Sequence, residues 1–134
     1  MPHATRIAHL EMIQRAIDRM SHESASIKTF ALASTAAVVS IAGATSSSFV
    51  GFAGIFLLII FWCMDAQYLA QERGFREMYS EALVTTPVNF VMTPSAAIRA
   101  KNTLLHTLWG WSTAPLYGAL VILCLGLALW IVIR

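Results

Sequence analysis

The sequence predicts an all-α membrane protein with three transmembrane helices. Two apolar runs, residues 49–64 and 115–133, contain no charge at all, and only 12% of the 134 residues are charged while 57% are hydrophobic. Soluble domains usually carry about twice that share of charge. At 1.5 Å per residue the second run spans about 28 Å, close to the hydrocarbon thickness of a bilayer. We therefore expect residues 1–134 to form one membrane domain.

The N-terminal segment, residues 1–26, is polar and predicts an amphipathic helix on the cytoplasmic side. Leu10, Ile13, Ile17 and Met20 recur at helical spacing and make one apolar stripe. That stripe faces either the membrane surface or the rest of the protein. The segment has no apolar core of the kind found in a cleavable signal peptide, so we expect none.

The first span, residues 27–44, is less apolar and rich in small and hydroxyl side chains. On a helix, one face would carry Ala33, Ala37, Ser40 and Ala44. Small faces allow transmembrane helices to approach closely. The alternative is that this face lines a wet passage, because hydroxyl groups are costly against lipid.

The remaining helices follow from turns and breaks in the pattern. The turn at residues 45–48 precedes a second span at 49–64, whose helix continues out of the membrane to Leu83 and is broken by residues 85–87. Residues 88–92 alternate weakly and suggest a short strand. Thr93-Pro94-Ser95 is typical of an N-cap with proline at the first helical position, and predicts a short helix at about 95–108. Ser112 or Thr113 would cap the third span, at 113–133. The cytoplasmic layer would thus be the N-terminal helix and the helices of 65–108.

Charge distribution predicts the orientation. With the N-terminus inside the cell, every Lys and Arg except Arg134 is cytoplasmic. Cytoplasmic segments of membrane proteins carry an excess of cations. We therefore expect the N-terminus to lie inside the cell and the C-terminus outside.

The helix that leaves the second span carries a seam of side chains at heptad-like spacing: Asp65, Tyr68, Glu72, Phe75 and Tyr79. Acids are unusual in such a seam. Copies of Asp65 from neighbouring subunits would form an acidic ring at a pore mouth. The alternative is that Asp65 accepts a hydrogen bond or pairs with a cytoplasmic cation.

The cytoplasmic segments also carry a set of cations that suggests a phosphate-binding surface. Arginine binds phosphate through its planar fork, and tyrosine rings stack on nucleobases. The alternative is contact with lipid headgroups. The candidate ligand-binding residues are Arg15, Arg19, Arg73, Arg76, Arg99, Lys101, Tyr68 and Tyr79.

Signatures of enzymes and metal sites are missing from the sequence. It has no H-E-x-x-H, no phosphate-binding glycine loop and no G-x-S-x-G. Cys63 and Cys124 lie in apolar runs and are expected to be buried packing residues. We expect no catalytic activity, no bound metal and no cofactor.

Four sequence segments carry a resemblance to a family of small bacterial membrane proteins. They cover nearly the whole chain in the same order, and the second is long and specific. Gly74 departs from the family pattern, which has a bulkier residue there. The segments are His9-Leu10-Glu11-Met12-Ile13-Gln14; Phe61-Trp62-x-x-Asp65-x-x-Tyr68-Leu69-x-Gln71-Glu72-Arg73-x-Phe75-Arg76-x-x-Tyr79; Phe90-x-Met92; and Ser112-Thr113-x-Pro115-x-Tyr117-Gly118.

On these segments the chain resembles the transmembrane effectors of bacterial anti-phage systems, in particular the Hailong type. The resemblance implies an oligomeric ion channel encoded beside a nucleotidyltransferase. Because three helices per subunit cannot enclose an ion path, we expect a homo-oligomer and specifically a tetramer. A short single-stranded DNA, an oligodeoxyadenylate, would hold it closed, and loss of that ligand would depolarise the cell. The alternatives are a non-conducting membrane adaptor that recruits a soluble partner, and a lipid-disrupting toxin.

Overall fold

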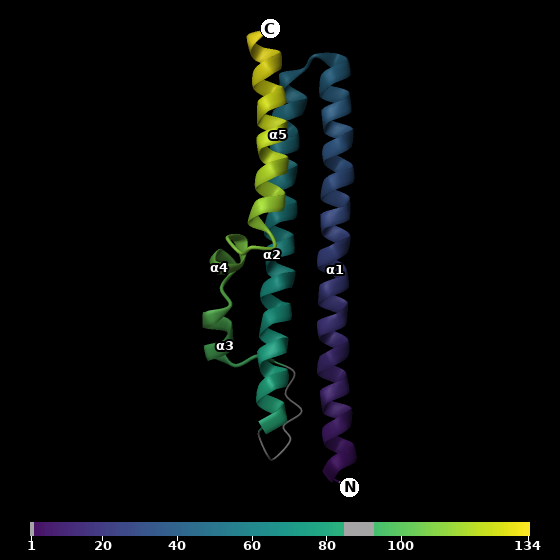
Figure 1. The fold of residues 1–134 in the computed structure, drawn as a ribbon, viewed down its shortest axis with the longest axis vertical. Helices are drawn as coiled ribbons and strands as arrows, with labels where there is room; N and C mark the ends of the chain where they lie inside the picture. The colour runs from purple at the N-terminus through teal and green to yellow at the C-terminus, as the bar shows by residue number, and fades with distance from the viewer. Residues whose placement is uncertain (1, 85–92) are drawn as a thin grey trace.

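The computed structural model describes residues 2–84 and 93–134, with side chains except at positions 2, 3 and 101. Those residues form helices and no strand (Figure 1), which confirms the all-α prediction for the described part. The predicted strand at 88–92 and the predicted helix break at 85–87 lie outside the described residues. The helices are α1 (Pro2–Thr45), α2 (Ser48–Val84), α3 (Ala96–Lys101), α4 (Leu104–Leu108) and α5 (Ala114–Ile133).

Three of these helices, α1, α2 and α5, are long and apolar enough to cross a membrane. Their 44, 37 and 20 residues correspond to about 66, 56 and 30 Å of helix, against about 30 Å of hydrocarbon. The prediction of three transmembrane helices is confirmed at this level. Only α5 matches the bilayer thickness, so α1 and α2 extend well beyond it.

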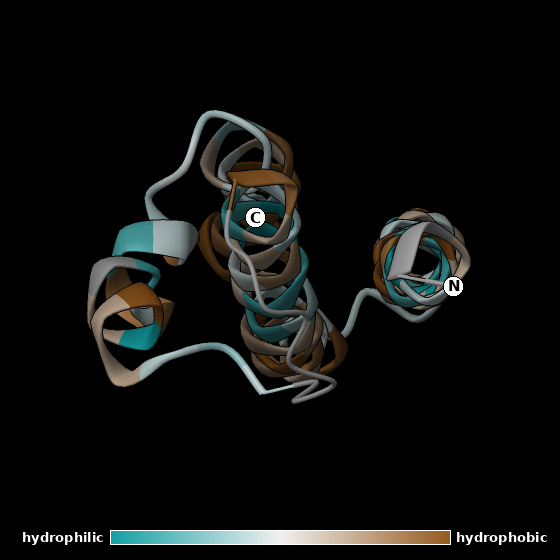
Figure 2. Ribbon diagram, turned by 90° about the horizontal axis from the view of Figure 1, so that it is seen from below, coloured by the Kyte–Doolittle hydropathy of each residue, from teal (hydrophilic) through white to brown (hydrophobic). Residues whose placement is uncertain are grey.

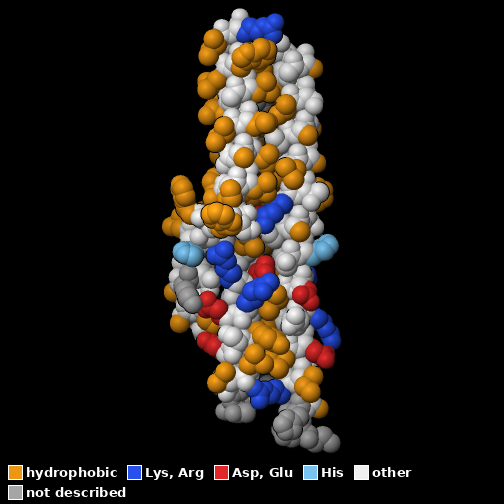
Figure 3. All heavy atoms as spheres, in the orientation of Figure 1, with side chains coloured by type: hydrophobic (Ala, Val, Ile, Leu, Met, Phe, Trp, Pro, Cys, Tyr) orange, Lys and Arg blue, Asp and Glu red, His pale blue; other side chains and the backbone are white. Residues whose placement is uncertain are grey.

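Charge separates the molecule into two parts along its length. Figure 3 shows charged side chains gathered in the lower part of the view, whereas the upper part is hydrophobic or small apart from the cation at the C-terminal end. We call residues 4–28, 65–84 and 93–112 the polar half, and residues 29–64 and 113–134 the apolar half. The apolar half contains the stretches suited to a bilayer.

α1 and α2 form an antiparallel hairpin with a tight turn at Ser46 and Ser47 (Figure 1). Ser46 has a φ of 51°, and the Ser47 N–H donates to the Ala42 carbonyl at 3.3 Å. A left-handed residue followed by this bond is the Schellman way of ending a helix. The turn predicted at residues 45–48 is confirmed.

α1 is one uninterrupted helix, whereas the sequence suggested a separate amphipathic helix at 1–26 followed by a span at 27–44. Hydropathy changes at that boundary, but no proline or glycine breaks the backbone there. The Ser26 hydroxyl donates to the His22 carbonyl of its own helix at 3.0 Å, so the serines at the boundary do not cap a new helix. The prediction that the second span continues as a long helix is confirmed by α2.

Two apolar clusters hold the hairpin together. In the polar half, the predicted stripe of α1 packs on α2, where Ile13 and Ile17 contact Met78. In the apolar half, Ala31, Leu58 and Tyr117 bring α1, α2 and α5 together. The stripe therefore faces the protein rather than the membrane surface. The buried Cys124 completes this second cluster, as predicted, and Cys63 is partly buried.

α3 and α4 lie across α2 from α1 (Figure 2) and replace the single helix predicted at 95–108. The Ser95 hydroxyl accepts from the Ile98 N–H at 3.4 Å and caps α3, so Pro94 precedes the cap and does not take the first helical position. α3 ends at Asn102, whose φ of −99° and ψ of 53° leave the helical range, and the Asn102 side-chain amide donates back to the Ile98 carbonyl. Thr113 occupies the N-cap position of α5, but its hydroxyl donates backwards to the Thr107 carbonyl of α4 at 2.7 Å.

Candidate functional site

The small face of α1 points away from α2 within the chain. Ala33, Ala37, Ser40 and Ala44 are all exposed, and the buried positions Ala31, Thr35 and Ala42 face the other helices instead. The Ser40 hydroxyl donates to the Ala36 carbonyl at 2.8 Å. This bond satisfies the hydroxyl inside its own helix, so Ser40 does not require a wet passage. Packing between subunits and pore lining both remain predictions.

Asp65 lies inside the subunit and not at a surface where copies could form a ring. Its side chain is 0% exposed, and its Oδ1 accepts a hydrogen bond from the Ser24 hydroxyl of α1. Its Oδ2 lies 3.6 Å from the Lys28 ammonium, also on α1. The structure thus gives Asp65 a hydrogen bond and a cation, which is the alternative interpretation of this acid, and in this conformation it does not line a pore mouth.

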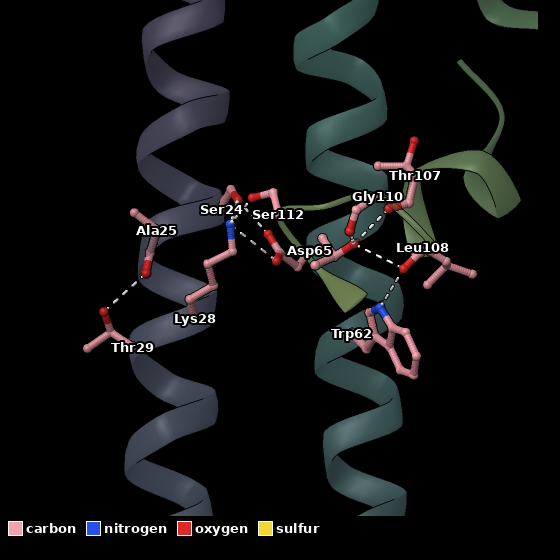
Figure 4. A network of polar contacts seen from close by, with 11 residues as sticks. Ser24, Ala25, Lys28, Thr29, Trp62, Asp65, Thr107, Leu108, Gly110 and Ser112 are labelled. Atoms are coloured by element: carbon pink, nitrogen blue, oxygen red, sulfur yellow. Dashed lines mark hydrogen bonds and ion pairs between the residues drawn. The ribbon is translucent and has the colours of Figure 1, made fainter. Parts of the chain in front are cut away.

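The ammonium of Lys28 joins several elements at this point (Figure 4). Besides Asp65, it lies 3.2 Å from the Ser112 hydroxyl, at the junction of α4 and α5, and 3.4 Å from the Ser24 hydroxyl. The side chain of Tyr117 on α5 lies beside Asp65. Its hydroxyl completes no hydrogen bond with the described residues, and neither does Asp65 Oδ2. We call Ser24, Lys28, Asp65, Ser112 and Tyr117 the boundary cluster.

An aromatic pair supports the boundary cluster. Trp62 stacks on Tyr117 with ring centroids 6.1 Å apart and ring planes inclined by 8°. Its indole N–H donates to the Leu108 carbonyl at 3.1 Å (Figure 4). The stack fixes the Tyr117 ring beside Asp65, while the indole bond ties the end of α4 to α2. Trp109 and Trp111 nearby are almost fully exposed, as expected of side chains at a membrane interface.

Sequence reasoning missed Lys28 as the partner of Asp65, although a signal was present. Lys28 and Asp65 lie the same number of residues from the helix ends at Thr45 and Ser48. In an antiparallel hairpin with a tight turn, equidistant residues lie at the same level. Once the turn is located, the position of the buried Asp65 on α2 therefore indicates that its cation on α1 is Lys28.

The predicted cations do not form one layer. Arg15 pairs with Glu11 at 3.3 Å on the exposed side of α1, and Arg76 pairs with Glu72 at 2.7 Å on α2. The guanidinium of Arg73 lies against Gly110 in the connection to α5. The side chain of Lys101 is outside the described part. Arg15, Arg73 and Arg76 do not share a position in this structure, and the ligand-binding role of all four residues stays a prediction.

Arg19 and Tyr68 do share a site, an open groove of about 550 Å³ between the polar halves of α1 and α2. Glu23, Gln67 and Gln71 also line this groove. A second groove of about 460 Å³ adjoins it, because Met20 and Gln71 line both, and carries Arg99 at its α3 side. We call the first of these the α1–α2 groove. Tyr79 lies elsewhere, packed against the Ile13 and Ile17 cluster.

Among the described residues, no three His, Cys, Asp or Glu side chains gather in a way that would hold a metal ion. Comparison of the chain with protein families, with characterised proteins and with solved structures finds no match. The functional argument therefore rests on the boundary cluster and the α1–α2 groove, together with the resemblance noted in the sequence.

Proposed function

We propose that this chain is the subunit of a homo-oligomeric ion channel of the bacterial inner membrane, gated from the cytoplasm by a nucleotide or short single-stranded DNA. Its role would be that of the anti-phage effectors it resembles, which depolarise the infected cell. One observation carries the proposal. The two helices that enclose the α1–α2 groove are the same two helices that continue, without a break, as candidate spans.

This continuity offers a mechanical route from ligand to membrane. Arg19 in the groove lies nine residues from Lys28 on the same helix, or about 14 Å along its axis. A ligand held between α1 and α2 fixes their separation at that level. Because an unbroken helix moves as a rigid rod over this distance, the separation of the two spans changes with it.

The side chains in the groove suit a nucleic acid strand. Arg19 provides a guanidinium for phosphate, Tyr68 provides an aromatic ring for base stacking, and Gln67 and Gln71 provide amides for base or sugar edges. Arg99 in the adjoining groove offers a second phosphate contact. Glu23 in the same groove carries the opposite charge to Arg19, so the aromatic ring and the amides are the features that favour a nucleic acid strand over a simple lipid headgroup.

The channel requires several subunits, because three helices cannot enclose an ion path. Most of the surface of the three candidate spans is exposed in the single chain. The small face of α1, with Ala33, Ala37, Ser40 and Ala44, suits close helix contact between subunits. We propose a tetramer, in which this face and the second span line or border the path.

The decisive experiment is ion flux from vesicles that contain the purified chain. We expect a potassium gradient to collapse without ligand and to persist when an oligodeoxyadenylate is present. Large dyes should stay inside. A chain that inserts but never conducts would instead be a membrane adaptor, and dye release without a size limit would indicate a lipid-disrupting toxin. Either result would overturn the channel proposal.

Substitution of two arginines that lie one helical turn apart tests the ligand site. Arg19→Ala should weaken binding of a labelled oligodeoxyadenylate about tenfold or more, because a hydrogen bond to a charged group contributes about 1.5–3 kcal/mol. Arg15→Ala removes the same charge outside the groove and is the matched control. Fluorescence anisotropy measures both, and affinity of the parent chain should fall steeply with salt. Equal losses in the two variants would contradict the groove as the binding site.

A further inference from the structure

We propose that the Lys28–Asp65 ion pair is a gating latch, which holds α1 against α2 and α5 in the closed channel and separates when the channel conducts. The inference rests on the proposed channel function and adds a device that connects the ligand groove to the spans. Three features support it: the position of the pair, its loose geometry and the consequence of separating it.

The pair lies between the groove and the spans. Glu23 and Met64 line the α1–α2 groove, and they are the direct sequence neighbours of Ser24 and Asp65. Ser24 donates to Asp65, and Lys28 lies one turn further along α1. A ligand seated in the groove therefore holds the backbone that carries the latch, and loss of the ligand frees that backbone to move.

The pair also links all three candidate spans. Asp65 belongs to α2, Lys28 to α1 and Tyr117 to α5, and Ser112 adds the connection that precedes α5 (Figure 4). Because residues of α1, α2 and α5 all lie beside the Asp65 carboxylate, separation of the ion pair changes how these three helices pack together.

The geometry of the pair is looser than a structural salt bridge requires. The Lys28 Nζ to Asp65 Oδ2 distance is 3.6 Å, whereas strong ammonium–carboxylate hydrogen bonds measure about 2.7–2.9 Å. Asp65 Oδ2 completes no hydrogen bond within the described residues. The Lys28 side chain remains 25% exposed, so its ammonium has a route to water along the surface of the hairpin.

Separation of the pair has a defined consequence for Asp65. A fully buried carboxylate without a cation is strongly unfavourable. Once Lys28 withdraws, Asp65 either takes up a proton or is reached by water and ions, and we assign the hydrated arrangement to the conducting state. The pair therefore has two states, one closed and dry and one separated and wet, which is the behaviour required of a gate. The acidic pore mouth predicted for Asp65 belongs to the second state.

The test compares ion flux in the presence of saturating oligodeoxyadenylate, when the parent channel is closed. Asp65→Asn and Lys28→Met each remove one charge, and each should leak about tenfold more than the parent. The double variant Lys28→Asp with Asp65→Lys restores opposite charges and should close again. Lys28→Arg keeps the cation and should close like the parent, as should Asp18→Asn, which neutralises an exposed acid on α1. Flotation with the vesicles confirms that each variant is inserted.

Each outcome decides the inference. Single variants that close as fully as the parent would show that the pair is only a structural contact. Leaky single variants together with an equally leaky exchanged pair would show that charge pairing is not the cause. If the parent itself shows no oligonucleotide-dependent flux, the proposed channel function fails first, and the latch fails with it.

Discussion

Serine and glycine residues determine much of how the helices of this chain pack. Ser26 and Ser40 donate to carbonyls one turn back on their own helix, so these polar side chains place no demand on their surroundings. Gly51 and Gly54 are buried where helices approach closely. Glycines in a transmembrane helix favour close approach of a neighbouring helix. The sequence could not show which helix each one contacts, because both faces of a transmembrane helix are apolar.

Gly54 offers a direct test of that close approach. A Cβ added at Gly54 would lie 2.5 Å from Cγ1 of Val38, on the neighbouring helix α1. Because valine is stiff at χ1, it cannot turn away. We expect Gly54→Ala to lower the free energy of unfolding in detergent by about 1–3 kcal/mol.

Two companion variants identify the cause of that loss. Adding Val38→Ala to Gly54→Ala removes the clashing side chain and should recover most of the stability. Gly43→Ala is the control, since its Cβ would meet nothing within 4 Å, and it should be neutral or slightly stabilising. A loss at Gly43 as large as at Gly54 would indicate a general effect of the substitution and not helix packing.

Helix boundaries were predictable where the backbone breaks and not where only hydropathy changes. The turn at 45–48 contains the left-handed Ser46, and it separates α1 from α2 as expected. The boundary at 26–27 changes polarity but has no breaking residue, so α1 runs through it. α2 likewise continues through Gly74, because a single glycine weakens a helix without ending it. The division of 95–108 into α3 and α4 occurs at Asn102, whose non-helical backbone angles and side-chain bond to the Ile98 carbonyl a helical pattern does not reveal.

The hydroxyl of Thr113 fixes the end of α4 to the start of α5, and a substitution at this position tests its contribution. Its buried hydroxyl donates to the carbonyls of Thr107 and Leu108 at 2.7 and 3.0 Å, which satisfies the open end of α4. Thr113→Val keeps the shape and removes the donor, so we expect a loss of about 1 kcal/mol in unfolding free energy. Thr103→Val is the matched control, because Thr103 is exposed and its side chain makes no capping bond. Equal effects in the two variants would show that the Thr113 hydroxyl contributes nothing specific.

The arrangement of the helices was partly contained in the sequence. A hairpin with a tight turn places Lys28 level with Asp65, and this relation predicts the boundary cluster once the turn is known. The place of α5 was not predictable, because its surface is uniformly apolar and offers no charge or stripe to orient it. The α1–α2 groove was also beyond sequence reasoning. It brings Arg19 and Tyr68 together while leaving Arg15, Arg73 and Arg76 elsewhere, and that selection depends on which faces of α1 and α2 meet.

Orientation in the membrane is the prediction on which the direction of gating depends. All Lys and Arg residues except Arg134 belong to one side of a three-span topology, and positive charge favours the cytoplasm. Single cysteines at two exposed or turn positions test this. Ser47→Cys in the hairpin turn should react with an impermeant maleimide in intact spheroplasts, whereas Ser21→Cys in the polar half should react only after the membrane is opened. The parent, whose Cys63 and Cys124 lie in the apolar half, gives the background. The opposite labelling pattern would place the α1–α2 groove outside the cell and exclude a cytoplasmic ligand.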